Sequence, residues 1–377
     1  MSAAGSAEPA RFAELLGLWQ PSHGRSGLPW QGTRDPYRVW LSEIMLQQTQ
    51  VASVLVYYPR FLERFHDVAV LAAASLDEVL GLWSGLGYYS RARNLHRCAH
   101  EVVTRHGGRF PDSAQVLQTL PGIGRSTAAA IAAFCFDERA AILDGNVKRV
   151  LTRLLGFEAD LATAAGERAL WSEATSLLPE APRAMPVYTQ ALMDLGATVC
   201  TAREPDCALC PVDELCVARR QGDPRRYPVR TKKLKRSAQS LWLLRAHSGE
   251  AVWLEKRPTP GIWAGLYCFP VFASRDDLQA ALAGPHRRSL ADGEPFVHVL
   301  THKDLHLHPV VAQLPASALR SGPLGLQEPQ SSTLPGVEGA WFGPQGWTQL
   351  GLPAPIRRLL AEPQLAVTLQ GGPALAE

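Results

Sequence analysis

The sequence predicts a mainly α-helical N-terminal region joined to a smaller α+β domain at the C-terminus. A length of 377 residues is more than one typical domain needs. Up to about residue 220, apolar positions recur at helical spacing between short breaks of Gly, Pro and Asp. From about residue 238 onward, apolar and polar residues alternate instead, which is typical of strands. These observations indicate two different architectures in one chain.

Short breaks divide the N-terminal region into candidate helices, which are 11–20, 36–48, 51–64, 76–83, 90–105, 113–119, 126–136, 146–155, 166–177 and 187–199. In the C-terminal domain, "SLWLLRAHSGEAVWLEKRP" predicts two strands around a Ser-Gly turn. Short helices fit 276–283 and 354–361. The polar segment 221–237 is interpreted as an interdomain linker.

The charge is concentrated near this linker. The chain carries a formal charge of +3, but nine Lys or Arg residues and one acid lie between residues 219 and 236. Such a run is either a solvated linker or a strip that binds phosphates. The N-terminus has no basic segment followed by an apolar core, so a signal peptide is not expected. No apolar stretch reaches the length of a membrane span, and we expect a soluble, intracellular protein.

Glu43 lies in the stretch "DPYRVWLSEIMLQQTQ", which predicts a helix that Asp35 can cap and Pro36 can begin. At 3.6 residues per turn this helix is apolar on nearly every side, which is typical of a buried helix. A buried carboxylate is costly unless it is paired or protonated. Glu43 is therefore either a satisfied structural acid or a catalytic acid held in a dry pocket.

Four of the seven cysteines share the compact spacing C-x6-C-x2-C-x5-C: Cys200, Cys207, Cys210 and Cys216. Four thiolates suit either zinc or an iron–sulfur cluster. Zinc ribbons generally present two C-x2-C pairs and this chain has one, so the spacing favours one [4Fe–4S] cluster. Four unliganded thiols in an intracellular protein remain the alternative.

A glycine turn and an acid form the second candidate site. In "LQTLPGIGRSTAAAIAAF" (117–134), Gly122 and Gly124 allow a sharp turn, and the helix that begins near Ser126 presents amides that can hold a phosphate. A plain helix–helix turn is the alternative. In "LDGNVKRVLTRLLG" (143–156), Asp144 is either a simple N-cap or a carboxylate directed at a site before the helix. The basic residues expected to face phosphates are Lys148, Arg149 and Arg153.

The stretch "GLGYYSRARNLHRCA" (85–99) contains two glycines around Leu86, followed by two tyrosines. One interpretation is a hairpin whose tyrosines enter the core. The other is an apolar wedge inserted into a base stack, with Arg91 and Arg93 facing backbone phosphates. Similar polar probes of nucleic acid are Gln47, Gln48 and Thr49.

Together these motifs resemble the helix-hairpin-helix family of DNA base-excision glycosylases, and within it the MutY-type adenine DNA glycosylases. The matching segments are "LPW" (28–30), "DPYRVWLSEIMLQQTQV" (35–51), "GLGYYSRARNLH" (85–96), "LPGIGRSTAAAI" (120–131), "DGNVKRVL" (144–151), "QALMDLGATVC" (190–200) and the four-cysteine loop. The resemblance covers nearly all of 10–220. It continues more weakly through the C-terminal domain, which is similar to the Nudix-like reader domain of that family.

The resemblance implies a domain organisation. A helix-hairpin-helix glycosylase domain is expected at 1–225, with a six-helix subdomain at about 31–145 and an iron–sulfur subdomain from 10–30 plus 146–225. A basic linker at 226–237, a Nudix-like domain for recognising 8-oxoguanine at 238–362 and a tail at 363–377 follow. No Nudix box is present in 238–362, so pyrophosphohydrolase activity is not expected.

The resemblance also implies a mechanism. Glu43 would protonate a flipped adenine, and an ionised Asp144 would stabilise the oxocarbenium-like sugar that forms. Bifunctional lyases of the family carry a nucleophilic lysine after the glycine turn, where this chain has Ser126, so simple hydrolysis of the glycosidic bond is expected. The expected substrate is duplex DNA with adenine opposite 8-oxoguanine or guanine. No membrane partner, a monomeric state and a cytoplasmic, nucleoid-associated location are also expected.

By the same resemblance, the adenine pocket would be formed by Leu28, Trp30, Gln31, Val51 and Gln190. The gap and the opposite base would be contacted by Gln48, Thr49, Leu86 and Tyr88. The DNA backbone would be held by the turn that contains Gly122, Gly124 and Ser126. In the reader domain, 8-oxoguanine would meet Thr301 and His302, in a Leu300-Thr301-His302 loop where the family usually has Phe-Ser-His. The departure at Leu300 makes the strength of this recognition an open question.

Two rival functions stay open. One is a glycosylase of the same fold that removes another base, such as thymine from a G·T mismatch. The other is a non-catalytic iron–sulfur protein that binds DNA or senses redox state. Glu43 and the added reader domain disfavour the first, and the presence of both Glu43 and Asp144 disfavours the second.

Overall fold

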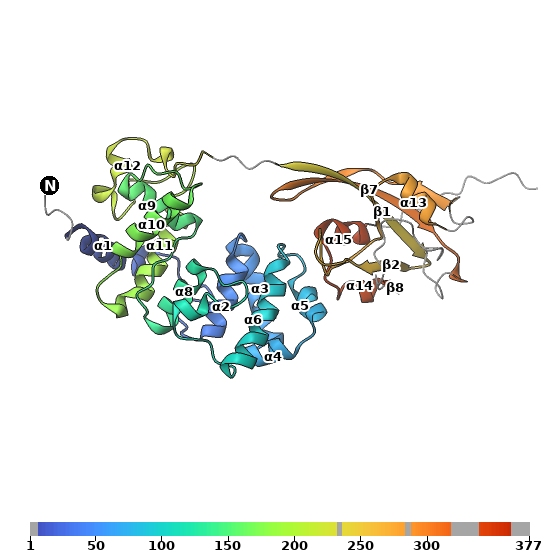
Figure 1. Ribbon diagram of the computed structural model, residues 1–377, viewed down its shortest axis with the longest axis horizontal. Helices are drawn as coiled ribbons and strands as arrows, with labels where there is room; N and C mark the ends of the chain where they lie inside the picture. The colour runs from blue at the N-terminus through green and yellow to red at the C-terminus, as the bar shows by residue number, and fades with distance from the viewer. Residues whose placement is uncertain (1–6, 232–235, 283–286, 288, 318–338, 363–377) are drawn as a thin grey trace, which may run out of the picture. The chain divides into compact units, whose positions relative to one another are not determined.

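The computed structural model describes residues 7–231, 236–282, 287, 289–317 and 339–362. The chain forms two compact units (Figure 1), of which the helical unit spans 1–74 and 90–233 and the sheet unit spans 75–89 and 234–377. The segment 75–89 therefore packs with the sheet unit, although in sequence it lies within the helical region. The predicted domain boundaries stay predictions. Most residues of the predicted linker at 226–237 are described, but 232–235 and the predicted tail at 363–377 lie outside the described residues.

The described α-helices of the helical unit are α1 (Ala7–His23), α2 (Pro36–Leu46), α3 (Val51–Arg64), α4 (Val68–Ala73), α6 (Ser90–His106), α7 (Ala114–Leu117), α8 (Arg125–Phe136), α9 (Gly145–Leu155), α10 (Ala164–Ser176), α11 (Met185–Thr198) and α12 (Val217–Arg220). Three single turns of 3-10 helix lie at Pro182–Ala184, Asp213–Leu215 and Pro224–Arg226. In the part of the chain that the structure describes, no helix is long and apolar enough to span a membrane.

Capping residues explain where several of these helices begin. The Asp35 carboxylate accepts a hydrogen bond from Tyr37 N (2.9 Å), and Pro36 occupies the first helical position of α2. Asp67 accepts from Ala69 N and Val70 N at 2.9 and 2.8 Å and caps α4. The sequence did not predict α4, because six mostly apolar residues show no helical period.

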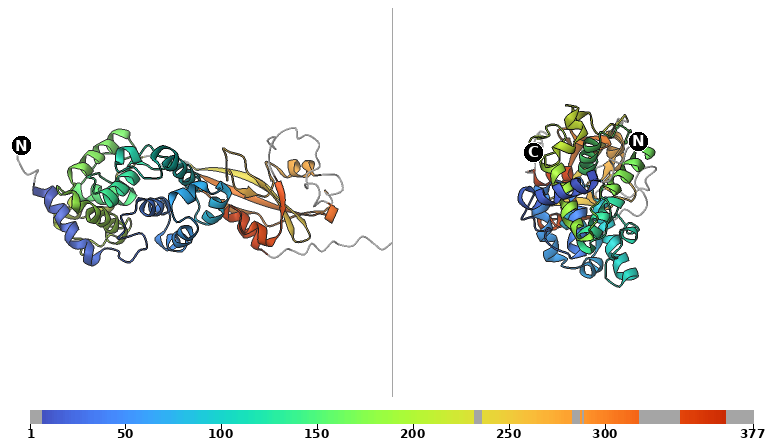
Figure 2. Two further views of the ribbon diagram at one scale, coloured as in Figure 1. Left: turned by 90° about the horizontal axis from the view of Figure 1, so that it is seen from below. Right: turned by 90° about the vertical axis from the view of Figure 1, so that its left-hand side faces the viewer.

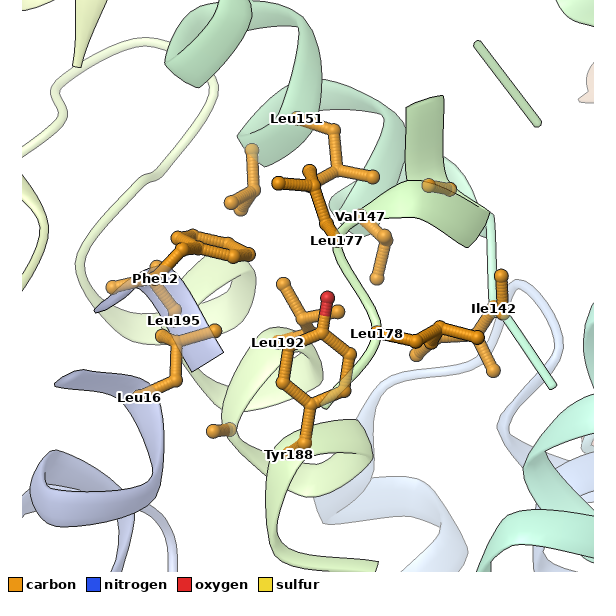
Figure 3. Packing of buried hydrophobic residues seen from close by; sticks show 14 of the residues in the cluster. Phe12, Leu16, Ile142, Val147, Leu151, Leu177, Leu178, Tyr188, Leu192 and Leu195 are labelled. Atoms are coloured by element: carbon orange, nitrogen blue, oxygen red, sulfur yellow. The ribbon is translucent and has the colours of Figure 1, made fainter. Parts of the chain in front are cut away.

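Apolar side chains of α1, α9 and α11 form one core (Figure 3), against which Cys200 and Cys210 of the cysteine loop pack; Asp144 caps α9 at its edge. Phe12 from α1, Leu151 from α9 and Leu195 from α11 are all buried and belong to one apolar cluster. Helix α8 joins this cluster through alanines that are 0–2% exposed, and such small side chains let α8 approach its neighbours closely. The N-termini of α8 and α9 are thereby held in a rigid frame.

The described residues of the sheet unit contain eight strands: β1 (Ser237–Ser248), β2 (Ala251–Lys256), β3 (Tyr267–Cys268), β4 (Val271–Phe272), β5 (Leu290–Asp292), β6 (Phe296–Val299), β7 (Lys303–Gln313) and β8 (Gly339–Phe342). The main path through the sheet is β3-β2-β1-β7-β5. Strands β1 and β7 pair in parallel from Ser237 opposite Lys303 to His247 opposite Gln313, and the other pairings are antiparallel. The predicted Ser-Gly turn lies between β1 and β2.

Figure 2 shows helices beside the sheet, and apolar clusters lie on both faces of the sheet. On one face, Ile356 and Leu359 of α15 (Ala354–Ala361) pack with Leu243 of β1 and Leu305 of β7. On the other face, Leu278 of α13 (Arg275–Ala281) belongs to a second cluster. A short helix, α14 (Pro344–Trp347), was not predicted, since it is a single turn.

Helix α5 (Leu76–Trp83) is the part of the sheet unit that comes from the N-terminal half of the chain. Gly81 lies against the backbone of Gln349, where no Cβ could fit. The Tyr89 hydroxyl donates to Leu352 O at 2.6 Å, and the Ser84 hydroxyl donates to the same oxygen at 3.2 Å. The turn that contains Leu86 is therefore held at both ends by the segment around Leu352.

A substitution at Gly156 tests how tightly α9 is joined to the cysteine loop. Gly156 ends α9 with φ at +61°, and an added Cβ would fall against Val217 Cγ1. We expect Gly156→Ala to lose roughly 1–2 kcal/mol through its left-handed backbone. Overpacking adds about 1–3 kcal/mol of destabilisation. Urea unfolding measures the loss.

The matched control is the same change in a Val217→Ala background, where the contact with Cγ1 is absent. In that background Gly156→Ala should lose less, mainly the backbone part, because Val217 Cβ at 3.1 Å is then the nearest side-chain atom. An equal loss in both backgrounds contradicts the proposed packing.

Candidate active site

A cavity of about 610 Å³ opens between α2, the loop before it and α11 in the helical unit. Glu43 of α2 lies in its wall, and Gln190 of α11 faces it from another side. Four of the five predicted adenine-pocket residues line this cavity: Leu28, Trp30, Gln31 and Gln190. The fifth, Val51, begins α3 and is not among the lining residues. The volume suits a ligand of the size of a nucleobase or nucleoside.

Glu43 is surrounded by protein atoms, although the residue is only partly buried and lines the cavity. Burial raises the pKa of Glu43 from 4.5 to about 7, and the negative charge of Asp144 adds to this shift. The positive charge of Arg25 opposes it. A carboxyl group with a pKa near neutrality can both hold and deliver a proton, as a general acid must.

Asp144 precedes α9, and its carboxylate accepts a hydrogen bond from Val147 N at 2.8 Å. Asp144 is thus an N-cap, as one of the two interpretations of the sequence expected. It is also close enough to Glu43 to affect its titration, so the second interpretation does not conflict with the first. Dipoles at the N-terminus of a helix favour the ionised form of a carboxylate.

Ser126 supports the segment that leads to Asp144. The Ser126 hydroxyl accepts a hydrogen bond from Leu143 N at 2.9 Å. The preceding turn is tight, because Gly122 has φ at +78° and an added Cβ would lie 2.7 Å from Asn94 Cβ. Glycine is therefore required at 122 for both its conformation and the close approach to α6.

The turn after α2 is organised from behind by Arg91. Its guanidinium donates to Ile44 O and Met45 O at 2.9 and 2.8 Å and to the Thr49 hydroxyl at 2.9 Å. The prediction that Arg91 faces phosphates is wrong, because this residue is only 8% exposed and its guanidinium donates hydrogen bonds to the carbonyls at the end of α2. Gln48, which follows, is exposed and has a left-handed backbone with φ at +56°.

The predicted wedge around Leu86 lies in the sheet unit, and its residues differ in exposure. Leu86 is only 6% exposed, whereas Tyr88 is 46% exposed with φ at +49°. The hydroxyls of Tyr88 and Thr301 lie 3.0 Å apart, within hydrogen-bond distance. Two predicted contacts of the opposite base, far apart in sequence, are therefore brought together. His302 is exposed beside Thr301.

The four cysteines line one small, largely apolar cavity of about 30 Å³ beside α9 and α11. Burial, with a smaller contribution from the charges of the three other cysteines, raises the pKa of Cys210 to about 12. Thiols in such a site ionise only if a cation compensates them. Among the described residues, no group of three or more His, Cys, Asp or Glu side chains is arranged to hold a metal ion. The shared cavity and the four soft donors nevertheless fit the chemistry of an iron–sulfur cluster.

Arg153 of α9 ties this loop to the core. It is 2% exposed and donates to Thr201 O, Ala202 O and Pro224 O at 2.6, 3.1 and 2.8 Å, and to Cys200 Sγ at 3.3 Å. The prediction that Arg153 faces phosphates is therefore wrong.

The other two basic residues predicted to face phosphates also have protein partners. Arg149 donates to Cys200 O and Gly196 O at 2.8 and 2.6 Å, which contradicts its predicted role as well. Lys148 pairs with Glu167 at 2.5 Å. A count of basic residues does not distinguish an arginine that binds carbonyls from one that faces solvent.

The sequence did not single out Arg25 and Asp194, which the structure places at the cavity and behind it. Arg25 lines the cavity, and its Nε donates to the buried Asp194 carboxylate at 2.7 Å. The signal was a charged residue in "QALMDLGATVC", since an acid on the apolar side of a helix needs a partner.

The comparisons with known proteins agree with this architecture. The HhH-GPD superfamily of base excision DNA repair proteins matches residues 41–174, and the NUDIX domain matches 241–362. A solved thermostable thymine-DNA glycosylase is 27% identical, with a TM-score of 0.52 over 58% of this chain and 100% of that one. The fold and the site thus define a DNA glycosylase with a helical N-terminal domain and a Nudix-like C-terminal domain, as the sequence predicted.

The relatives specify the family. Adenine DNA glycosylase of Buchnera aphidicola (subspecies Acyrthosiphon pisum) is 33% identical over 351 residues, which cover 93% of this chain and 96% of that protein. The human adenine DNA glycosylase is 44% identical over 224 residues, covering 57% of this chain and 40% of that protein. The chain belongs to the adenine DNA glycosylase family.

The buried acid should make stability depend on pH. Between the unfolded pKa of 4.5 and the folded value of about 7, the unfolded chain ionises Glu43 while the folded chain keeps it protonated. The free energy of unfolding of the wild type therefore falls as pH rises from 4.5 to about 7. The contribution of Glu43 to this fall is on the order of 3 kcal/mol. Glu43→Gln should remove that loss.

The measurement is the difference in free energy of unfolding between Glu43→Gln and the wild type at several pH values. The difference should grow in favour of the variant from about pH 4.5 to 7 and then stay level. A difference that does not change with pH contradicts a raised pKa for Glu43.

Proposed function

We propose that this enzyme is a monofunctional glycosylase that excises adenine opposite 8-oxoguanine, and adenine opposite guanine, by hydrolysis of the N-glycosidic bond. The observation that carries the proposal is Glu43, an acid with a pKa near 7 in the wall of a cavity of nucleobase size. Asp144 close by supplies the second carboxylate that such hydrolysis needs. The names of the full-length relatives support adenine as the base that is removed.

In the proposed reaction, adenine leaves the base stack and enters the cavity. Glu43 donates its proton to the base, so that the bond between base and sugar can break with a neutral leaving group. The sugar becomes oxocarbenium-like, and the ionised Asp144 stabilises its positive charge until water adds. Arg25 limits how far the pKa of Glu43 rises, which keeps proton transfer possible near neutral pH.

The proposal of a monofunctional enzyme rests on Ser126. A lyase would need an amine nucleophile to form a Schiff base with the sugar. The Ser126 hydroxyl instead accepts a hydrogen bond from Leu143 N. Its role in this proposal is to hold the segment before Asp144, so the strand would stay intact after the base is removed.

Recognition of the opposite base is assigned to Gln48, Thr49, Leu86, Tyr88, Thr301 and His302. The hydroxyls of Tyr88 and Thr301 already face each other, which supports a shared contact with an oxidised purine. Leu86 is buried, so its use as a wedge requires the turn to expose it. The turn at 122–126 would hold the DNA backbone through amides at the N-terminus of α8.

We further propose that Cys200, Cys207, Cys210 and Cys216 hold one [4Fe–4S] cluster. Such a cluster, when bound, supplies positive iron centres that keep the four thiolates ionised and cross-link the loop. Arg153 orients this loop through its carbonyls and Cys200 Sγ. The cysteine cavity and the adenine cavity share no lining residue, and in this proposal the cysteine loop contributes to DNA binding rather than to the chemistry.

The solved thymine-DNA glycosylase makes thymine removal the second candidate, since its fold matches this chain. The two functions differ in what the leaving base requires. A buried acid with a pKa near 7 favours a base that leaves as a protonated purine, and therefore favours adenine.

A single-turnover assay tests the proposed activity. Duplexes with one A·8-oxoguanine, A·G or G·T pair are incubated with excess enzyme, and strand breaks are counted with and without hot alkali. We expect alkali-dependent breaks at the adenine of the first two duplexes only. Glu43→Gln and Asp144→Asn should each lower the rate by at least about a hundredfold, because each removes one of the two carboxylates.

The control for this assay is binding of the same duplexes, which both variants should retain. Breaks without alkali would contradict the monofunctional proposal. Cleavage at G·T but not at A·8-oxoguanine, or full activity of Glu43→Gln, would contradict the proposed role of Glu43.

The cluster has its own test. Protein purified without oxygen should contain iron and acid-labile sulfide in equal amounts, and Cys210→Ser should lose both while Cys98→Ser keeps them. Cys98 is a suitable control, since it is buried in α6 away from the loop. Zinc without sulfide in the wild type would contradict the proposal.

A further inference from the structure

Asp194 is a fully buried carboxylate on α11 with no role in the proposed chemistry. It is 0% exposed, and it does not itself line the adenine cavity. An unpaired ion at such a site is costly, so the donors around it show what it does. Asp194 accepts hydrogen bonds from Arg25 Nε (2.7 Å), Arg25 N (3.1 Å) and Gln190 Nε2 (2.9 Å).

Every one of these donors belongs to a residue of the cavity wall. Arg25 and Gln190 both line the cavity, and the Arg25 side chain is 28% exposed. The loop passes very close to the carboxylate, because a Cβ at Gly24 would lie only 2.8 Å from Asp194 Oδ2. Both the backbone and the side chain of Arg25 are thus fixed by one acid behind the wall.

Further hydrogen bonds connect Arg25 to the rest of the loop. Gln31 Nε2 donates to Arg25 O at 3.0 Å, and Leu28 N donates to Gln31 Oε1 at 3.2 Å. Leu28 and Gln31 are two further lining residues. Apolar packing holds the loop at Trp30, which is 9% exposed with its ring centroid 5.4 Å from that of Tyr58, whereas Leu28 and Gln31 are only partly buried. A hydrogen-bond chain from Asp194 therefore connects α11 to much of the cavity wall.

We propose that Asp194 is a positioning residue that holds Arg25 and Gln190 in place, and with them the loop at 24–31, against a base in the cavity. The inference rests on the proposed function for its catalytic consequence. Displacement of positioning groups by about 1 Å can cost roughly a hundredfold in rate, even when they are remote from the chemistry.

The electrostatics give this role a distinctive signature. The charges that act on Glu43 are those of Asp144, which raises its pKa, and of Arg25, which lowers it. If Asp194 holds the Arg25 charge near Glu43, loss of Asp194 releases Arg25 and has the same effect on Glu43 as loss of Arg25. In both cases the pKa of Glu43 rises, and activity that needs its protonated form extends to higher pH.

The experiment compares Arg25→Ala, Asp194→Asn and the double variant in the full-length protein. Single-turnover rates on an A·8-oxoguanine duplex are measured with saturating enzyme over a range of pH. Each single variant should be about tenfold to a hundredfold slower at neutral pH. The basic limb of the pH–rate profile, where the rate falls as pH rises, should move to higher pH in both single variants. The double variant should be no slower than the slower single variant.

A matched control separates positioning from general loss of stability. Asp67→Ala removes a carboxylate that caps α4 with two hydrogen bonds and does not line the cavity. It should lower the melting temperature without moving the basic limb. Arg25→Lys, which keeps the charge, should leave the limb closer to that of the wild type than Arg25→Ala.

Two results would overturn the inference while the proposed function stands: rate losses of the single variants that multiply in the double variant, or a basic limb that Asp194→Asn leaves unmoved. If the wild type does not release adenine at all, the proposed function fails instead. Hydrogen exchange then still decides the structural part, because Asp194→Asn should speed exchange of the amides at 24–31 but not of those in α8. Unchanged exchange at 24–31 rejects the positioning role under either outcome.

Discussion

The site depends on the removal of one carboxyl group, that of Glu43, from water. Burial is the largest contribution to its raised pKa, and the nearby charges of Asp144 and Arg25 adjust the result in opposite directions. The apolar surface of α2 produces this burial, since Trp40, Leu41, Ile44 and Met45 are all at most 2% exposed. A helix that is buried on nearly every side stabilises the fold and also raises the pKa of Glu43 toward neutral pH.

The two candidate carboxylates differ because their surroundings differ. Glu43 lies within α2, whose backbone amides are bonded within the helix and are therefore not free to cap its carboxylate. Asp144 precedes α9 and accepts a hydrogen bond from Val147 N. Two groups that differ by one methylene thus have different surroundings: burial raises the pKa of Glu43, and Asp144 caps a helix.

Buried arginines connect the functional segments to the core. Arg91 binds the carbonyls at the end of α2, and Arg153 binds those of the cysteine loop. Each guanidinium binds several backbone oxygens at once. A segment with few apolar residues can then take one conformation, which a site on a loop requires. The buried carboxylate of Asp194 fixes a loop in a comparable way, but there the backbone amide of Arg25 is the donor.

The sequence by itself determined the class of fold, most helix positions and the principal candidate residues. Helical spacing, the capping residue Asp35 and the alternation in β1 are local properties, so they can be recognised without tertiary information. It also singled out Glu43, because an acid among apolar residues is unusual wherever the helix lies. Only the tertiary structure decided which arginines face inward, since Arg91 and Arg153 find their partners 42 to 71 residues away along the chain. The same holds for α5, which packs against the segment around Leu352, and for the pairing of Arg25 with Asp194 across 169 residues. Such contacts depend on the path of the whole chain, and local spacing carries no information about them.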